Sequence, residues 1–81
     1  MFLHIGDNHM VDSREVVLIG DIESSGSSEI TEEFLHISGE EGFIVDYSNG
    51  NARSFILTGE TIYFSMISSA TLAKRMRNLI N

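Results

Sequence analysis

The histidines are the residues of this chain whose side chains are most suited to bind a metal ion. The three histidines are His4, His9 and His36. None of them stands at the i, i+4 helical spacing of a zinc motif, and the chain has no cysteine to complete a thiolate site. His4 and His9 flank a turn that contains Asp7, so a metal site there is the alternative to ordinary surface or half-buried histidines. We expect ordinary histidines, and no metal ion or other cofactor.

Carboxylates are abundant, since aspartate and glutamate account for 12 of the 81 residues. Most of them are expected to form a solvated face. Asp21 and Glu23 alternate at the end of a predicted strand, as an acid–base pair would, but no cleft pattern surrounds them. The serines lie in predicted loops and caps without a Gly-x-Ser-x-Gly elbow, and the glycines are scattered over turns. We therefore predict that the protein is not an enzyme and takes no small-molecule substrate.

The charges are unevenly distributed along the chain, whose formal net charge is -7. Residues 1–41 hold ten acidic residues and one base, Arg14, while residues 42–81 hold two acidic residues and four bases. Salt screens each patch beyond about 8–10 Å, so a basic face can exist on an acidic protein. Net charge therefore does not exclude nucleic acid as a partner.

The four bases of the second half are candidate contacts for a phosphate backbone. They are Arg53, Lys74, Arg75 and Arg77. The last three share a predicted helix, where they form either an ordinary solvated face or a phosphate-contacting patch. Arg53 follows a turn at Asn49-Gly50. In a homo-oligomer this single arginine is repeated in every subunit, which multiplies its contribution to DNA binding through counterion release.

Periodicity and turn residues predict the elements that position these side chains. Strands are expected over residues 2–5, 9–11, 15–22, 43–47, 53–58 and 61–66, and helices over 29–37 and 71–80. Strand 15–22 reads as buried on both faces at its centre. Ser28 is the predicted N-cap of the first helix and Gly39 its end, with Ile30, Phe34 and Ile37 on its apolar face.

The order β-β-β-α-β-β-β-α predicts a single small α+β domain over residues 1–81. Asn49-Gly50 is a hairpin signal, and residues 58–61 form a second tight turn with Ser68-Ser69 capping the last helix after it. These short connections predict an antiparallel meander of the last three strands, in a mostly antiparallel sheet with both helices on one face. A core of this size seldom supplies more than about 3–5 kcal/mol, which favours oligomerisation.

The opening residues carry no basic lead and no apolar run of signal-peptide length. No stretch approaches the ~20 apolar residues of a spanning helix. We expect a cytoplasmic protein with no membrane partner.

Several segments resemble a known family of small bacterial proteins. "MFLHIGD", "EEFL", "ARSFILT" and "IYFSMISSATLAKRM" are similar to the RemA/RemB group of extracellular matrix (biofilm) regulators, with the opening and closing segments closer to the RemB branch. The resemblance covers residues 1–77. It implies a cytoplasmic, non-enzymatic transcriptional regulator that assembles into a closed ring and binds DNA through a basic outer surface.

The resemblance also implies roles for single positions. In the RemA branch the segment corresponding to "SNGNARS" is a Tyr-Gly-Arg-Arg-Thr-Arg type run whose arginines contact DNA. Its paired arginines fall at Gly50 and Asn51 of this chain, and its last arginine is kept as Arg53. Arg14 matches a further basic position of the family and is expected at the subunit interface.

Two functions stay open at this point. In the first, a multimer presents Asn51, Arg53 and the basic helix to double-stranded DNA, and senses DNA shape because no recognition helix is evident. In the second, the protein is an assembly or adaptor protein. Its acidic helix with Glu29, Glu32 and Glu33 would then contact another protein, such as a RemA-type relative with a basic surface.

Overall fold

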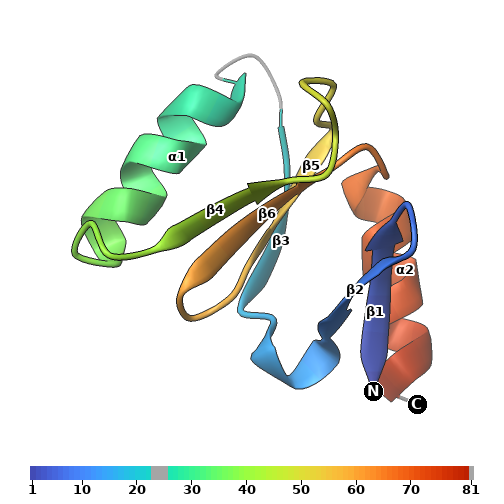
Figure 1. The fold of residues 1–81 in the computed structure, drawn as a ribbon. Coiled ribbons are helices and arrows are strands. Elements are labelled where there is room, and N and C mark those ends of the chain that lie inside the picture. Colours follow the sequence, from blue (N-terminus) through green and yellow to red (C-terminus); the bar gives the residue numbers. More distant parts are fainter. Residues whose placement is uncertain (23–25, 81) are drawn as a thin grey trace.

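Six strands and two helices make up the computed structural model, which describes residues 1–22 and 26–80 (Figure 1). In chain order the elements are β1 (Phe2–Gly6), β2 (His9–Asp12), a 3-10 turn (Ser13–Glu15), β3 (Leu18–Asp21), α1 (Gly26–Ile37), β4 (Phe43–Asp46), β5 (Ser54–Leu57), β6 (Thr61–Ser65) and α2 (Ser69–Ile80). This order confirms the predicted α+β class. Glu23, one half of the proposed acid pair, lies outside the described residues.

The strands form two sheets. β1 and β2 make an antiparallel hairpin, and the larger sheet has the order β3-β5-β6-β4. β3 with β5 and β5 with β6 are antiparallel, whereas β4 runs parallel to β6. The sheet is therefore mostly antiparallel, as predicted.

The predicted meander is wrong, because β4 does not pair with β5. The N–H of Tyr47 donates to the carbonyl of Phe64 at 3.0 Å, and the N–H of Arg53 donates to the carbonyl of Ser65 at 2.8 Å. Both flanks of the Asn49-Gly50 turn are thus bonded to β6, which lies between them. The turn exists as a local structure but closes no hairpin.

Other local predictions hold. The N–H of Thr58 donates to the carbonyl of Thr61 at 2.8 Å, which closes the hairpin between β5 and β6. Ser68 caps α2, since its hydroxyl accepts from the N–H of Thr71 at 3.3 Å. Gly39, two residues after the last residue of α1, takes a φ of +72°, a conformation that suits glycine at a helix end.

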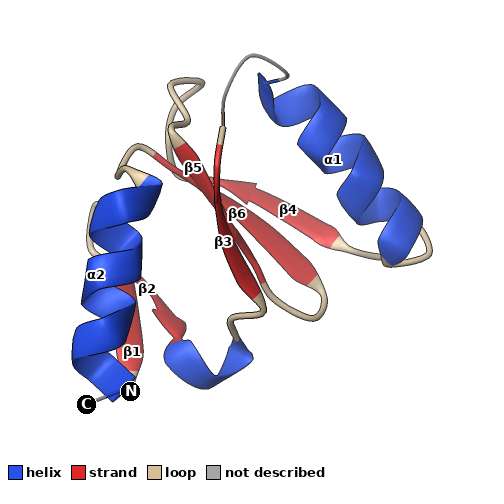
Figure 2. Ribbon diagram, turned by 180° about the vertical axis from the view of Figure 1, so that it is seen from behind, coloured by secondary structure: helices blue, strands red, loops and turns tan. Residues whose placement is uncertain are grey.

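Apolar residues cover both faces of the larger sheet. One buried cluster joins Leu3, Ile5, Val11, Ile56 and Leu72 on the side of α2 and the β1–β2 hairpin. The other joins Phe34 of α1 to Ile62 and Phe64 of β6. Figure 1 and the reverse view in Figure 2 show α1 on one side of the sheet and α2 on the other. The prediction of both helices on one face is wrong because β5 and β6 are apolar on both faces.

The segment around β3 differs most from its prediction. Residues 13–15 form a 3-10 turn, and β3 spans only Leu18–Asp21. β3 is an edge strand that pairs with β5 alone, so Val17 and Leu18 stay 68% and 50% exposed instead of being buried. Gly20 in β3 lies opposite Phe55, and a Cβ at Gly20 would overlap the Phe55 ring.

Helix α1 begins earlier than expected and is apolar over a shorter stretch. Its first residue is Gly26, so Ser28 lies inside the helix and is not its N-cap. Phe34 is buried and Ile30 packs beside it, but Ile37 is 68% exposed. None of the helices in the described ranges is long and apolar enough to cross a membrane.

Candidate nucleic-acid interface

Arg53 has a hydrogen-bonded backbone and an exposed side chain. Its N–H donates to Ser65 of β6 at 2.8 Å, and its carbonyl accepts from the N–H of Ile22, just after β3, at 3.1 Å. The arginine side chain itself is exposed. The fold therefore fixes the backbone of Arg53 and leaves its side chain exposed.

The turn before Arg53 is organised by one carboxylate. The Asp46 side chain accepts hydrogen bonds from the hydroxyl and, at 2.7 Å, from the backbone N–H of buried Ser48. The hydroxyl bond in particular holds the pKa of Asp46 below its usual range, and the N–H groups of Ser48 and Gly50 add to this effect against the opposing effect of desolvation. A negative carboxylate thus fixes the turn at neutral pH.

The tip of this turn is exposed and tightly wound. Asn49 and Gly50 both have positive φ, 53° and 83°, and the N–H of Asn51 donates to the carbonyl of Ser48 at 3.0 Å. Such a pair of left-handed residues is typical of a type I′ turn. Asn51 and Arg53 therefore follow a turn of defined shape.

On α2 the three bases have different surroundings. Lys74 and Arg77 are exposed and three positions apart, which makes them neighbours on the helix surface. Arg75 is half-buried, and its Nη1 donates to the backbone carbonyl of His4 in β1 at 3.0 Å. Arg75 thus joins α2 to β1, and we do not retain it as a phosphate contact.

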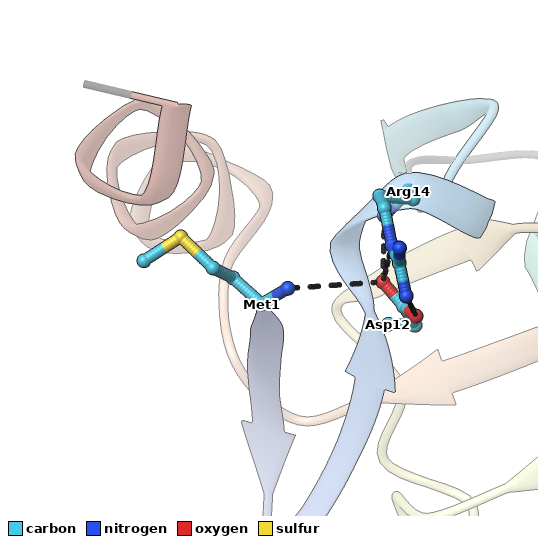
Figure 3. Close-up of polar contacts among 3 residues, drawn as sticks. All are labelled: Met1, Asp12 and Arg14. Atoms are coloured by element: carbon cyan, nitrogen blue, oxygen red, sulfur yellow. Dashed lines mark hydrogen bonds and ion pairs between the residues drawn. The ribbon is translucent and has the colours of Figure 1, made fainter.

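Arg14 is engaged by a carboxylate of its own chain (Figure 3). Its Nε and Nη2 donate to the two carboxylate oxygens of Asp12 at 3.2 and 2.8 Å. The amino group of Met1 lies 4.0 Å from the same carboxylate. The side-chain hydrogen bond from Arg14, with a further one from its backbone N–H, lowers the pKa of Asp12 to about 2. The charge of Arg14 is therefore compensated before any partner arrives.

The exposed bases of the chain do not gather on a single face. Phe55 and Leu57 of β5 belong to the α1 side, and side chains alternate along a strand. Continuing this alternation places Arg53 on the α1 side, whereas Lys74 and Arg77 belong to α2 on the opposite side. The exposed bases Arg53, Lys74 and Arg77 of one chain therefore lie on two sides of the larger sheet.

The histidines do not converge on a metal site. His9 stacks on Tyr47, with ring centroids 3.6 Å apart, and His4 lies beside Arg75. His36 is exposed near the end of α1. Within residues 1–22 and 26–80, no group of three or more His, Cys, Asp or Glu side chains is placed to hold a metal ion.

Buried serines are the structural residues that sequence reasoning missed. Ser48, Ser54 and Ser65 are fully buried. The hydroxyl of Ser54 donates to the carbonyl of Ile67, and that of Ser65 donates to the carbonyl of Ile5, both at 2.6 Å. Ser54 and Ser65 stand beside apolar residues in predicted strands, which is the sequence feature that indicates their burial. For Ser48 the feature is its position two residues after Asp46.

Comparison with known proteins identifies the family. Residues 2–76 match the model of the RemA-like family, described as extracellular matrix regulatory protein A-like. This protein belongs to the RemA-like family. It is 39% identical over 75 residues to extracellular matrix regulatory protein B of Bacillus subtilis (strain 168), which covers 93% of this chain and 89% of that protein. The resemblance found in the sequence motifs, including the RemB branch, is confirmed.

This RemA-like protein also has an acidic surface on α1. Glu29, Glu32 and Glu33 are exposed on α1. In the described part of the chain the ion pairs are those that Asp12 makes with Arg14 and the amino terminus, so these glutamates belong to none. α1 therefore presents uncompensated negative charge.

Proposed function

We propose that the protein is a regulator of extracellular matrix (biofilm) genes that binds double-stranded DNA as a homo-oligomer. Membership of the RemA-like family and the likeness to extracellular matrix regulatory protein B support the regulatory role. The observation that carries the DNA contact is Arg53, whose backbone is fixed between β3 and β6 while its side chain is exposed. The role is a non-enzymatic one, in the cytoplasm where DNA is accessible.

Oligomerisation supplies the number of contacts that one subunit lacks. Each phosphate contact contributes about -0.9 to the slope of log K against log salt. Three subunits that each bring only Arg53 to the duplex give a slope of about -2.7. Contacts from Lys74 and Arg77 add to this slope, and Asn51 adds a neutral hydrogen-bonding group beside Arg53.

Sequence preference in this proposal comes from DNA shape. Phosphate contacts fix register and orientation but carry no sequence information directly. A ring or row of subunits favours DNA that bends easily along its surface. Arg14, already paired with Asp12, is assigned to the subunit interface instead of the DNA.

The test is a set of matched arginine variants in a fluorescence-anisotropy titration of labelled duplexes. Arg53→Ala is expected to weaken binding equally for different sequences and to flatten the salt slope, while Arg53→Lys keeps most of both. Arg53→Lys is thus the matched control, because it changes the side chain and keeps its positive charge. If Arg53→Ala leaves affinity and slope unchanged, Arg53 is not the DNA contact.

A second function is favoured by the free glutamates of α1. An adaptor protein of this family would bind another protein, such as a RemA-type relative with a basic surface, through Glu29, Glu32 and Glu33. Co-purification of such a relative at low salt, and its loss in a variant with all three glutamates changed to glutamine, would support this function. Failure to co-purify at low salt would count against it.

A further inference from the structure

An apolar groove lies between α1 and the larger sheet. Its volume is about 580 Å³. Phe55, Leu57 and Ile62, from the two central strands, line it together with Leu18 of β3 and Ile37 of α1. Leu18 is 50% and Ile37 is 68% exposed. A strip of apolar side chains is thus open to solvent on the face of the sheet.

The groove exists because one helix is too narrow for this face. Neighbouring strands are about 4.8 Å apart, so four strands span about 14 Å between their outer axes. A helix is about 10 Å across with its side chains, and covers about two strands. The opposite face is covered by α2 and the β1–β2 hairpin together, whereas α1 stands alone on its side (Figure 2). The uncovered strip has the width of a second helix.

The rim of the groove is negatively charged. Glu29, Glu32 and Glu33 of α1 line it beside the apolar residues. All three are exposed, and none belongs to an ion pair within the described ranges. A partner that fills the groove with apolar side chains therefore gains affinity from lysines or arginines along one edge.

We propose that this groove binds an amphipathic helix of another protein, with apolar residues at i, i+3, i+4 and i+7 and basic residues on the flank beside α1. α1 has 12 residues, so a partner helix of three turns, about 18 Å long, matches the groove. This binding site is separate from DNA binding. It rests on the proposed adaptor function, because both require that α1 contacts another protein.

A helix fits the site better than a strand or a second copy of the chain. An added strand pairs along a sheet edge, but Phe55, Leu57 and Ile62 belong to strands inside the sheet. α2, the basic helix of a second copy, has its apolar face occupied, since Leu72 is buried and Met76 packs in the same cluster. α1 of a second copy would bring like charges to the rim.

The probe is a fluorescein-labelled synthetic peptide with leucines at helix positions i, i+3, i+4 and i+7 and lysines elsewhere. We expect saturable binding, with amide shifts of the ¹⁵N-labelled protein confined to the lining residues. Ile37→Ser and Leu18→Ser should each weaken binding about tenfold, because each removes an exposed apolar contact. Phe43→Ser is the matched control, since Phe43 is 65% exposed and lies outside the groove, and it should bind as the wild type does.

Two further experiments distinguish binding in the groove from nonspecific electrostatic attraction of the basic peptide to the acidic helix α1. A peptide with glutamates in place of the lysines should not bind, and Glu33→Gln should weaken the lysine peptide several-fold, while Glu60→Gln should not. Absence of saturable binding, or binding unaffected by Ile37→Ser and Leu18→Ser, overturns the proposal. Binding that responds to Glu33→Gln but to neither apolar variant leaves the adaptor function standing and refutes the groove. If the amide signals of the groove residues shift with protein concentration in the absence of peptide, the groove binds a second copy of the chain. That result also overturns the proposal.

Discussion

Replacing Ser65 by alanine tests how the β1–β2 hairpin is attached to the sheet. Ser65 is fully buried, and its hydroxyl donates to the carbonyl of Ile5 at 2.6 Å and accepts from the N–H of Ile67 at 3.0 Å. The register of β1 against β2 shifts between His4 and Gly6, at the position of Ile5. The Ser65 hydroxyl bonds to the Ile5 carbonyl at this irregularity, across 60 residues of the chain.

The expected loss of stability follows from these two bonds. A buried backbone group without a hydrogen-bond partner costs about 1–3 kcal/mol, so Ser65→Ala should lower the free energy of unfolding by about 2–6 kcal/mol. A chain of 81 residues has a total of about 4–12 kcal/mol on average values per residue. The substitution should therefore remove a large part of the stability.

Urea unfolding followed by circular dichroism measures this loss. Ser54→Ala is the matched variant, because Ser54 is equally buried but makes one bond, to the carbonyl of Ile67, and should lose about 1–3 kcal/mol. Both serines bond to Ile67, so their effects should be coupled. The loss of unfolding free energy in the double variant should therefore differ from the sum of the two single losses. A loss below about 0.5 kcal/mol for Ser65→Ala, the range of ordinary surface substitutions, would refute this account of the hairpin.

Two other predictions concern β3 and the N-terminal region. Gly20→Ala should lower the free energy of unfolding by about 1–3 kcal/mol, because the new Cβ overlaps the Phe55 ring; a Tm equal to that of the wild type would contradict this packing. The Asp12 carboxyl should titrate near pH 2 by NMR, and nearer its ordinary value of about 3.9 in Arg14→Ala. Since the pKa is lowered in the folded state, the stability that Arg14 adds should be present above about pH 4 and disappear as the pH falls through about 2. An Asp12 titration that Arg14→Ala leaves unchanged would show that the pair is not formed in solution.

Local signals in the sequence predicted those elements that depend on neighbours in the chain. The Thr58–Thr61 turn and the Ser68 cap of α2 close bonds over three residues, and both are found. The Asn49-Gly50 turn is also found, but its two residues do not determine which strand lies beside β4. The strand that pairs with β4 is β6, a central strand with apolar residues on both faces. The backbone on both sides of the turn forms hydrogen bonds with β6.

The candidate site shows the same division. The residue types identified Arg53, Lys74 and Arg77 as exposed bases, but α2 periodicity could not show that Arg75 reaches the carbonyl of His4, 71 residues away. Asp12 compensates the charge of Arg14 at a separation of two residues, so the signal for this pair is present in the local sequence.

The most direct test of the proposed function is a titration of a labelled random-sequence duplex with the wild-type protein, at low salt and again at about 150 mM salt. We expect saturable binding at low salt that weakens steeply as salt is added. The slope of log K against log salt should be about -2.7 or steeper. Arg53→Ala should flatten that slope in the same experiment. No binding even at low salt would contradict DNA binding by this protein and leave the acidic surface of α1 as the contact for its partner.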